Sequence, residues 1–545
     1  MMMRRRKSSG AFPPPLRRCS TASVASLSSS AGSISDYIQT IDQITNDDNI
    51  HGSYEYSFLH RIRRFFCFDA LDLQSTGMRN AKMISTLDEG SFTRISHYGV
   101  DVCFTDEYHL PGVTLERYRQ IGDPEMDRLL TKLNVGPFDD VISAAATAAA
   151  SNDPTISETT QELAQFYKHY EQVPSWVDFD QIQRGINVFL AYLPAAGCAL
   201  YYRSLVGGFS IPKIVEVLKS TRYLMSDRKK TLERLIDTGG LLAACFAPTI
   251  GGHMPAESLR PGGKGWIAAL QVRVLHAKVR RRLLQRKGMT SSQAWDTDKN
   301  GIPINQEDLA ATLLAFSVNV LVGIEIIAGK PLPVNEQLDY LALWRYIGWL
   351  LGIDTPESED VSSNGSGDSL DSFPIDPCAP TMLHSYASLE SILVHILHPE
   401  PSSCDLVTHL LSVTGSITFR AEVCRKLIGN PLADALGLQN CSCWKGWRAD
   451  AIQTFVLSLF VKAAVFIYFM IFRFYTLLTM NCPWFKKKAT CWHGELERKF
   501  LQKWEEGHPQ RMRAASKIGS ATSANASVAT SSFCPFSMVM PPQER

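Results

Sequence analysis

The stretch VRVLHAKVRRRLLQR, residues 272–286, places a single histidine, His276, within a helical pattern of apolar residues. On a helix over residues 266–286, with about 100° of turn per residue, four apolar residues fall within about 60° of the histidine: Ala269, Val272, Val279 and Leu283. An imidazole in such a stripe is either a core histidine satisfied by a hydrogen bond or a ligand to a metal or cofactor. The helical period therefore predicts the local structure and leaves two roles open for His276.

Basic residues occupy two other sides of the same helix. Arg280 and Arg273 lie on one flank, at about 40° and 60° from His276, whereas Lys278 and Arg281 point to the far side, where we expect water. A haem needs a neutral imidazole nitrogen, apolar surface for the macrocycle and cationic donors for its propionates. One hypothesis for this helix is therefore that His276 is the metal ligand of a haem, with Arg273 and Arg280 as cofactor-binding residues; a core histidine remains the alternative.

A second helix is predicted over TLERLIDTGGLLAACF, residues 231–246. Arg234 and Thr238 are four residues apart and share a face, with Asp237 beside both. Two glycines follow, and each costs about 1 kcal/mol in a helix relative to alanine, which is tolerable where something flat or bulky approaches the backbone. The alternative is an Arg234–Asp237 ion pair on a solvated face beside a glycine kink.

Composition and charge exclude several classes of protein. The 545 residues contain 55 Lys+Arg and 54 Asp+Glu, so no strong field points to nucleic acid. The 13 cysteines are scattered, which predicts reduced thiols in a cytosol-facing protein. Residues 1–35 are rich in Arg, Ser and Pro without an acidic residue, which is typical of a disordered tail or, alternatively, of a mitochondrial transit peptide.

Composition also divides the rest of the chain. We predict an N-terminal extension of uncertain structure (36–159), a helical domain (160–450) with a flexible acidic insertion (355–380), an apolar helix (451–482) and a basic, then disordered tail (483–545). Within the helical domain, Asn305 can cap a helix that runs to Ala328 and stops at Gly329.

The most apolar stretch, residues 454–480, is longer than the about 20 residues that span a bilayer. Lys462 and Arg473 interrupt it, and their side chains could snorkel toward opposite interfaces of one tilted helix. The lysines at 486–488 would then favour a cytoplasmic C-terminal flank. We predict membrane association; the alternative is a buried or interfacial helix of a soluble domain.

A zinc site is not predicted. The candidate ligands Cys441, Cys443, Cys482, Cys491 and His493 have the wrong spacing, because the apolar stretch separates the first pair from the rest. The glycine-rich PGGKG, residues 261–265, lacks the spacing of a phosphate loop and is interpreted as the turn before the histidine helix.

Several segments together resemble one known family. In order they are VPSWVDFDQIQRG (173–185), RLIDT (234–238), PGGKGWIAALQVRVLHAKVR (261–280), GIPINQEDLAATLLAFS (301–317), YLALWRYIGWLLGI (340–353) and RKLIGNPLADALGL (425–438). This chain is similar over roughly residues 160–450 to the latex-clearing, or rubber oxygenase, family, together with the ER-bound oxygenase mpaB of mycophenolic-acid synthesis. The joint order and the VRxxHAxVR pattern carry the resemblance.

The resemblance implies an all-α, globin-like multi-helix domain that binds haem b through one proximal histidine, which maps to His276. The Arg-x-x-x-Thr pair of the distal pocket maps to Arg234 and Thr238. Rubber oxygenases have lysine before that threonine, and Asp237 here puts a rubber-type substrate or an identical distal proton path in doubt. Our hypothesis is that Asp237 is a base for an allylic proton.

Members of the family use dioxygen to cleave a carbon–carbon double bond in an isoprenoid chain. We therefore predict a haem b-dependent oxygenase of an apolar, isoprenoid small molecule, with no nucleic-acid partner. The expected location is a membrane, at the endoplasmic reticulum facing the cytosol, with the mitochondrion as the alternative. The competing hypothesis is a non-catalytic, membrane-associated binding or scaffold protein that retains the fold.

Overall fold

The structure is a computed structural model. It describes residues 92–98, 100–105, 110–134, 136, 140–151, 157–221, 228–248, 255–285, 294–353, 378, 382–438 and 449–507. Contacts divide the chain into Met1–Glu55 and Tyr56–Arg545, and every described residue lies in the second unit. The predicted tail at 1–35 and, apart from Cys378, the insertion at 355–380 lie outside the described residues.

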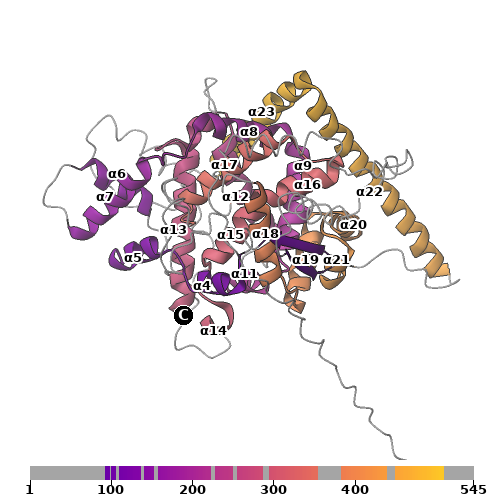
Figure 1. Cartoon of the computed structure of the whole chain (residues 1–545), viewed down its shortest axis with the longest axis horizontal. Helices are drawn as coiled ribbons and strands as arrows, with labels where there is room; N and C mark the ends of the chain where they lie inside the picture. Colours follow the sequence, from indigo (N-terminus) through magenta and orange to yellow (C-terminus); the bar gives the residue numbers. More distant parts are fainter. Residues whose placement is uncertain are drawn as a thin grey trace, which may run out of the picture. The chain divides into compact units, whose positions relative to one another are not determined.

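The described part consists mainly of helices, which confirms the predicted all-α, multi-helix fold (Figure 1). One antiparallel hairpin, β1 (Phe92–His97) and β2 (Val100–Thr105), was not predicted. The helices before the histidine helix are α4 (Gly112–Tyr118), α5 (Pro124–Lys132), α6 (Val141–Ala150), α7 (Glu158–Glu171), α8 (Phe179–Ala191), α9 (Leu193–Cys198), the π-helix η2 (Ala199–Leu205), α10 (Val206–Gly208), α11 (Pro212–Ser220), α12 (Arg228–Phe246) and the 3₁₀ turn η3 (Pro255–Leu259).

The histidine helix is α13 (Lys264–Leu284), as the helical period predicted. It is followed by α14 (Thr297–Asn300), α15 (Gln306–Phe316), α16 (Val318–Ala328), α17 (Val334–Leu350), α18 (Met382–Ile396), α19 (Pro401–Thr414), α20 (Ile417–Ile428), α21 (Asn430–Ala435), α22 (Ala449–Asn481) and α23 (Pro483–Gly507). The predicted helix over 231–246 is α12, which packs against α13.

The hydrophobic core extends across the boundary predicted at residue 160. Leu115 of α4, Met126 of α5 and Ile142 of α6 belong to the same buried cluster as Trp266 of α13 and Tyr346 of α17. The N-terminal extension therefore shares its core with the helical domain, because α5 and α6 bury their apolar faces against α7 and α13, and α4 packs against α15 and α18.

The helix predicted from Asn305 to Ala328 begins and ends as expected. The Asn305 Oδ1 accepts the backbone N–H of Asp308 at 2.9 Å, and Gly329 closes the segment with a left-handed φ of 78°. The prediction of one continuous helix was wrong, because the segment breaks into α15 and α16 at Ser317, where φ is −102° and ψ is −94°. The buried Ser317 hydroxyl donates to the Leu313 carbonyl at 2.9 Å.

Asp308, next to that cap, makes the stability of the fold depend on pH. Burial, and then the charge of Glu307, raise the pKa of this carboxyl from 3.8 to about 7. Unfolding therefore releases a proton between pH 4 and 7, and stability falls as pH rises through that window. We expect Asp308→Asn to be the more stable form above pH 7, by up to about 4 kcal/mol, and to lose this advantage below pH 4. Urea unfolding across that range tests the prediction, with the exposed Asp405→Asn as a control; parallel pH profiles for wild type and Asp308→Asn would contradict it.

The predicted basic, then disordered tail begins at residue 483, and its part after residue 507 lies outside the described residues. The apolar helix predicted over 451–482 is α22, but residues 483–507 form a further helix, α23, which packs against α8 and α12 (Figure 1). The His493 Nδ1 contacts the Leu190 carbonyl at 2.6 Å, and the Lys264 Nζ contacts Glu505 at 2.8 Å. These buried and paired groups hold α23 on the body, and the basic composition of 483–507 did not predict this helix.

The predicted snorkelling of Arg473 was also wrong. Its side chain is fully buried, and Nε and Nη2 donate to the carbonyls of Ile327 and Ile326 at 2.6 and 2.9 Å. The last carbonyls of a helix have no partner within it, and Gly329 leaves room for the guanidinium, 3.3 Å from where a Cβ would lie. Arg473 therefore caps α16, while Lys462 is half-buried.

By length and composition alone, two described segments could cross a membrane. They are Gln306–Ala328, whose apolar window is 83% buried in the protein, and Val456–Asn481, whose window is 22% buried. The bent pair Phe179–Ala191 and Leu193–Gly208 passes the same test jointly. The first segment is α15 and α16 in the core, so α22 is the segment that leaves apolar surface uncovered.

Candidate active site

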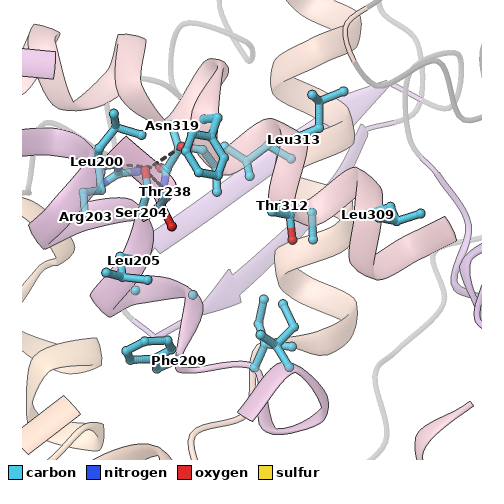
Figure 2. A pocket seen from close by; sticks show the side chains of 18 of the residues that line it. Leu200, Arg203, Ser204, Leu205, Phe209, Thr238, Leu309, Thr312, Leu313 and Asn319 are labelled. Carbon is cyan, nitrogen blue, oxygen red and sulfur yellow. Dashed lines mark hydrogen bonds between the residues drawn. The ribbon is translucent and has the colours of Figure 1, made fainter. Parts of the chain in front are cut away.

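A cavity of about 730 Å³ lies within the helical core. Side chains of η2, α11, α12, α13, α15, α16, α17 and α18 line it, and most of them are apolar. In Figure 2, Leu309, Thr312 and Leu313 of α15 lie on one side of the pocket and Arg203, Ser204 and Asn319 on the other. The volume falls within the about 300–1,000 Å³ of typical small-molecule sites.

His276 lines this cavity from α13. Neither ring nitrogen has a hydrogen-bond partner among the described residues, and Nδ1 is fully buried. Burial, and secondarily the charge of Arg280, lower the pKa of His276 from 6.5 to about 4, so the imidazole is neutral at physiological pH. His276 is therefore not a core histidine whose ring is satisfied by a hydrogen bond from another described residue.

Two predicted residues of α12 line the same cavity. Thr238 turns its hydroxyl back to the Arg234 carbonyl at 3.2 Å, and the Asp237 Oδ1 accepts the indole N–H of Trp504 at 3.3 Å. Asp237 is only 6% exposed, which excludes the alternative of a carboxylate on a solvated face. Because α12 packs along α13, the structure brings Asp237, Thr238 and His276 together around one cavity.

Arg234 is half-buried and is not among the residues that line the cavity. The two glycines after Thr238 do allow flat groups to approach the backbone, but these groups are aromatic side chains of the protein itself. A Cβ at Gly240 would lie 2.5 Å from the Trp504 indole, and one at Gly239 would lie 3.2 Å from the Phe500 ring. The close approach that we predicted at this backbone is therefore made by α23.

The predicted cofactor-binding arginines also lie outside the cavity lining. The Arg273 guanidinium binds Asp123 at 2.6 and 2.9 Å and Glu125 at 2.9 Å, and Arg280 binds Asp127 at 2.7 Å. These three carboxylates belong to the N-terminal end of α5, which covers this flank of α13. The structure thus occupies both guanidinium groups with protein, and we do not retain them as cofactor-binding residues.

The far side of α13 is not open to water as expected. Lys278 is 7% exposed, and the Arg281 Nη1 donates to the Leu130 carbonyl of α5 at 2.7 Å. The reason is that α5 and α6, from the extension whose structure could not be predicted, pack against α13. The sequence-based expectation for Lys278 was therefore wrong.

Sequence reasoning missed the cation that does line the cavity, which is Arg203 on η2. Its Nε donates to the Asn319 Oδ1 at 2.6 Å, and Asn319 in turn donates to the Ser204 hydroxyl at 3.3 Å (Figure 2). A signal was present in the sequence, because Arg203 is the single charge in the apolar run 193–211.

The described residues contain no group of three or more His, Cys, Asp or Glu that could hold a metal ion by themselves. Cys441 and Cys443 of the rejected zinc site lie outside the described residues. A metal at His276 would therefore need most of its ligands from a cofactor.

Residues 187–463, half of the chain, match the family described as ER-bound oxygenase mpaB/B'/Rubber oxygenase, catalytic domain. The chain belongs to this family. The matched segment contains every residue that lines the cavity except Tyr98. The cavity is therefore built from the catalytic domain of a family of oxygenases, as the resemblance predicted.

A solved structure described as "Structure of Latex Clearing Protein LCP in the closed state" is similar at 18% sequence identity, with a TM-score of 0.46, over 71% of this chain and 91% of that chain. No curated protein matches the chain.

The residues around this cavity fit a haem. A haem requires a neutral imidazole with an unengaged nitrogen and an apolar enclosure for the macrocycle. His276 is neutral and lacks a hydrogen-bond partner in the described part of the chain, and leucine, isoleucine, valine and phenylalanine side chains dominate the lining.

Proposed function

We propose that the protein is a haem b-dependent oxygenase that uses dioxygen to cleave a carbon–carbon double bond in an apolar, isoprenoid molecule. One observation carries the proposal: an imidazole without a hydrogen-bond partner among the described residues lines a large apolar cavity in the catalytic domain of an oxygenase family. The apolar lining favours a hydrocarbon substrate, because it would leave the polar groups of a sugar or nucleotide without partners.

The chain's own residues have distinct roles in this proposal. His276 binds the iron through a neutral ring nitrogen, because burial keeps the imidazole unprotonated. Haem, when bound, would supply dioxygen binding and the electron chemistry. Thr238 offers a hydroxyl to the space that His276 faces, Asp237 takes an allylic proton on its carboxylate, and the buried walls exclude water.

An absorption spectrum followed by a dioxygen-consumption assay tests the proposal. We expect the purified full-length protein to show a Soret band and to consume dioxygen with a member of a panel of prenylated or polyene compounds. A colourless but folded preparation, obtained after expression with added haem, would instead support the non-catalytic binding or scaffold protein.

Asp237→Asn is expected to lower turnover by about 100-fold or more, the lower range for removing a general base. Asparagine keeps the acceptor for the Trp504 indole N–H, so α23 and the haem content should be unaffected. The measurements are kcat with the best substrate of the panel and the Soret absorbance per protein. An unchanged kcat would end the proposed role of Asp237 and leave the haem assignment intact.

We also propose that the protein lies on a membrane through α22, at the endoplasmic reticulum facing the cytosol. Eight large apolar side chains of α22 are 40–70% exposed: Val456, Leu457, Leu459, Phe460, Phe466, Ile467, Ile471 and Phe474. Five of them, at 456, 460, 467, 471 and 474, fall within about 60° on the helix and extend over about 27 Å. A stripe of this size on a soluble surface marks a protein or membrane contact.

Two further observations favour a bilayer as the partner of this face. The opposite face of α22, with Val465, Phe469 and Arg473, is buried against the body along the same length, so α22 lies along the protein and does not stand free of it. Beyond its end, Trp484 and Trp492 are more than 60% exposed and Lys487 and Lys488 are exposed, which suits a headgroup region.

Replacing Phe460, Ile467, Ile471 and Phe474 together with serine should reduce co-sedimentation with vesicles of phosphatidylcholine and phosphatidylserine by about tenfold or more, since about 0.8 kcal/mol is lost per CH₂ withdrawn from lipid. Ile236→Ser, an exposed apolar residue on α12, is the matched control. Retention of wild type in membranes after carbonate extraction would favour a span, and concentration-dependent dimers that disappear in the variant would favour a second copy as the partner.

A further inference from the structure

Arg203 is a buried cation at the edge of an apolar cavity. It lies on η2, a π-helical turn, and such turns are frequent at functional sites. The side chain is 8% exposed, and burial lowers its pKa to about 10, so it remains positively charged at neutral pH. Arg203 lines this cavity together with His276.

Neutral groups hold this guanidinium in place. Nε donates to the Asn319 Oδ1 and Nη1 to the Leu427 carbonyl, both at 2.6 Å. Ser204, which accepts from Asn319, donates to the Ala315 carbonyl at 2.6 Å. The network fixes the orientation of the guanidinium but supplies no negative charge.

Within the described residues, Nη2 of Arg203 has no hydrogen-bond partner and the guanidinium forms no ion pair. Two carboxylates, Asp237 and Glu390, line the same cavity, and neither is paired with it. A buried charge without a counter-ion is strongly destabilising, so this arrangement is expected where a ligand brings the opposite charge. The preferred partner of a fixed guanidinium is a carboxylate, which can accept two parallel N–H bonds.

We propose that Arg203, positioned by Asn319 and Ser204, binds a carboxylate at one end of the cavity. Resting on the proposed function, the substrate class is then an isoprenoid or polyene acid, with its carboxylate on Arg203 and its apolar chain along the lining of α12, α13 and α15. The same chemistry could come from a propionate of the bound haem. Both sources require an anionic oxygen at Nη2 of Arg203, and they differ in which molecule carries it.

Paired acids and esters distinguish these sources. Full-length protein expressed without added haem is titrated with a fluorescent conjugated-polyene fatty acid and its methyl ester, and separately with haem and haem dimethyl ester. We expect wild type to bind one of the two acids about 10- to 100-fold more tightly than its ester, the range for one charge-assisted pair. A preference within the fatty-acid pair assigns the site to the substrate, and a preference within the haem pair assigns it to the cofactor.

Variants then test the residue. Arg203→Gln should remove the preference for the acid and leave the affinity for the ester unchanged, while Arg203→Lys should retain part of the preference. Thr312→Val changes an uncharged residue of the same lining and should retain all of it. Circular dichroism and Tm show whether each variant is folded.

Equal affinities of wild type for acid and ester in both pairs, or no binding of either acid, overturn the proposal without any variant. A preserved preference in folded Arg203→Gln overturns it as well. Acid preference without haem binding would refute the proposed function and leave this site standing. A Soret band without any acid preference would support the proposed function and refute the carboxylate site at Arg203.

Discussion

His276→Ala yields a folded protein without haem. The Soret band falls to background and dioxygen consumption is lost, because no other histidine lines the cavity among the described residues. The loss should approach the full signal, since one coordinate bond carries the assignment. The measurement is the ratio of Soret to protein absorbance after purification with added haem, with circular dichroism to verify the fold.

His409→Ala is the matched control, because the His409 Nε2 contacts the Thr231 hydroxyl at 3.2 Å and lies outside the cavity. This variant should keep the haem. In His276→Gly, added imidazole should restore the band by entering the space left by the side chain. A full Soret band in His276→Ala would place the iron ligand elsewhere and remove the basis of the proposed function.

Arg473→Leu is expected to lower the free energy of unfolding by about 3 to 5 kcal/mol, the range for breaking a buried charged interaction. Leucine removes both donors from the carbonyls of Ile326 and Ile327, and these acceptors stay buried at the junction of α16 and α22. The measurement is urea unfolding of the full-length protein in mild detergent, followed by circular dichroism.

Lys462→Leu, on the same helix, is the control and should change stability by about 0.5 kcal/mol or less, because Lys462 is half-buried. If Arg473→Leu proved equally mild, α22 would not be fixed to α16 in solution. The proposal that α22 lies along the body would then fail in favour of an independent spanning helix.

Helical period and capping rules were sufficient for the local structure around the site. The extents of α12 and α13, the cap at Asn305 and the stop at Gly329 follow from residues within one or two turns of each other. The break at Ser317 could not be predicted, because the apolar period continues through it.

The sequence was a poor guide to which arginine faces the cavity. Arg273 and Arg280 lie on the predicted flank of His276, but carboxylates about 150 residues earlier in the chain occupy that flank. Arg203 comes from a π-helical turn whose direction no helical period predicts. The position of an arginine on the helix that carries His276 therefore does not predict its partner, because the neighbouring helices determine which group the guanidinium binds.

The sequence by itself determined the family, the helical class and the helix that carries His276, because each depends on residue order or local period. The tertiary structure alone decided that His276, Asp237 and Thr238 share one cavity with Arg203, that Trp504 fills the space above Gly240, and that Arg473 serves as a cap. The physical reason is that burial and charge pairing depend on contacts between distant segments, such as Asp237 and Trp504, which are 267 residues apart, and no local pattern contains them.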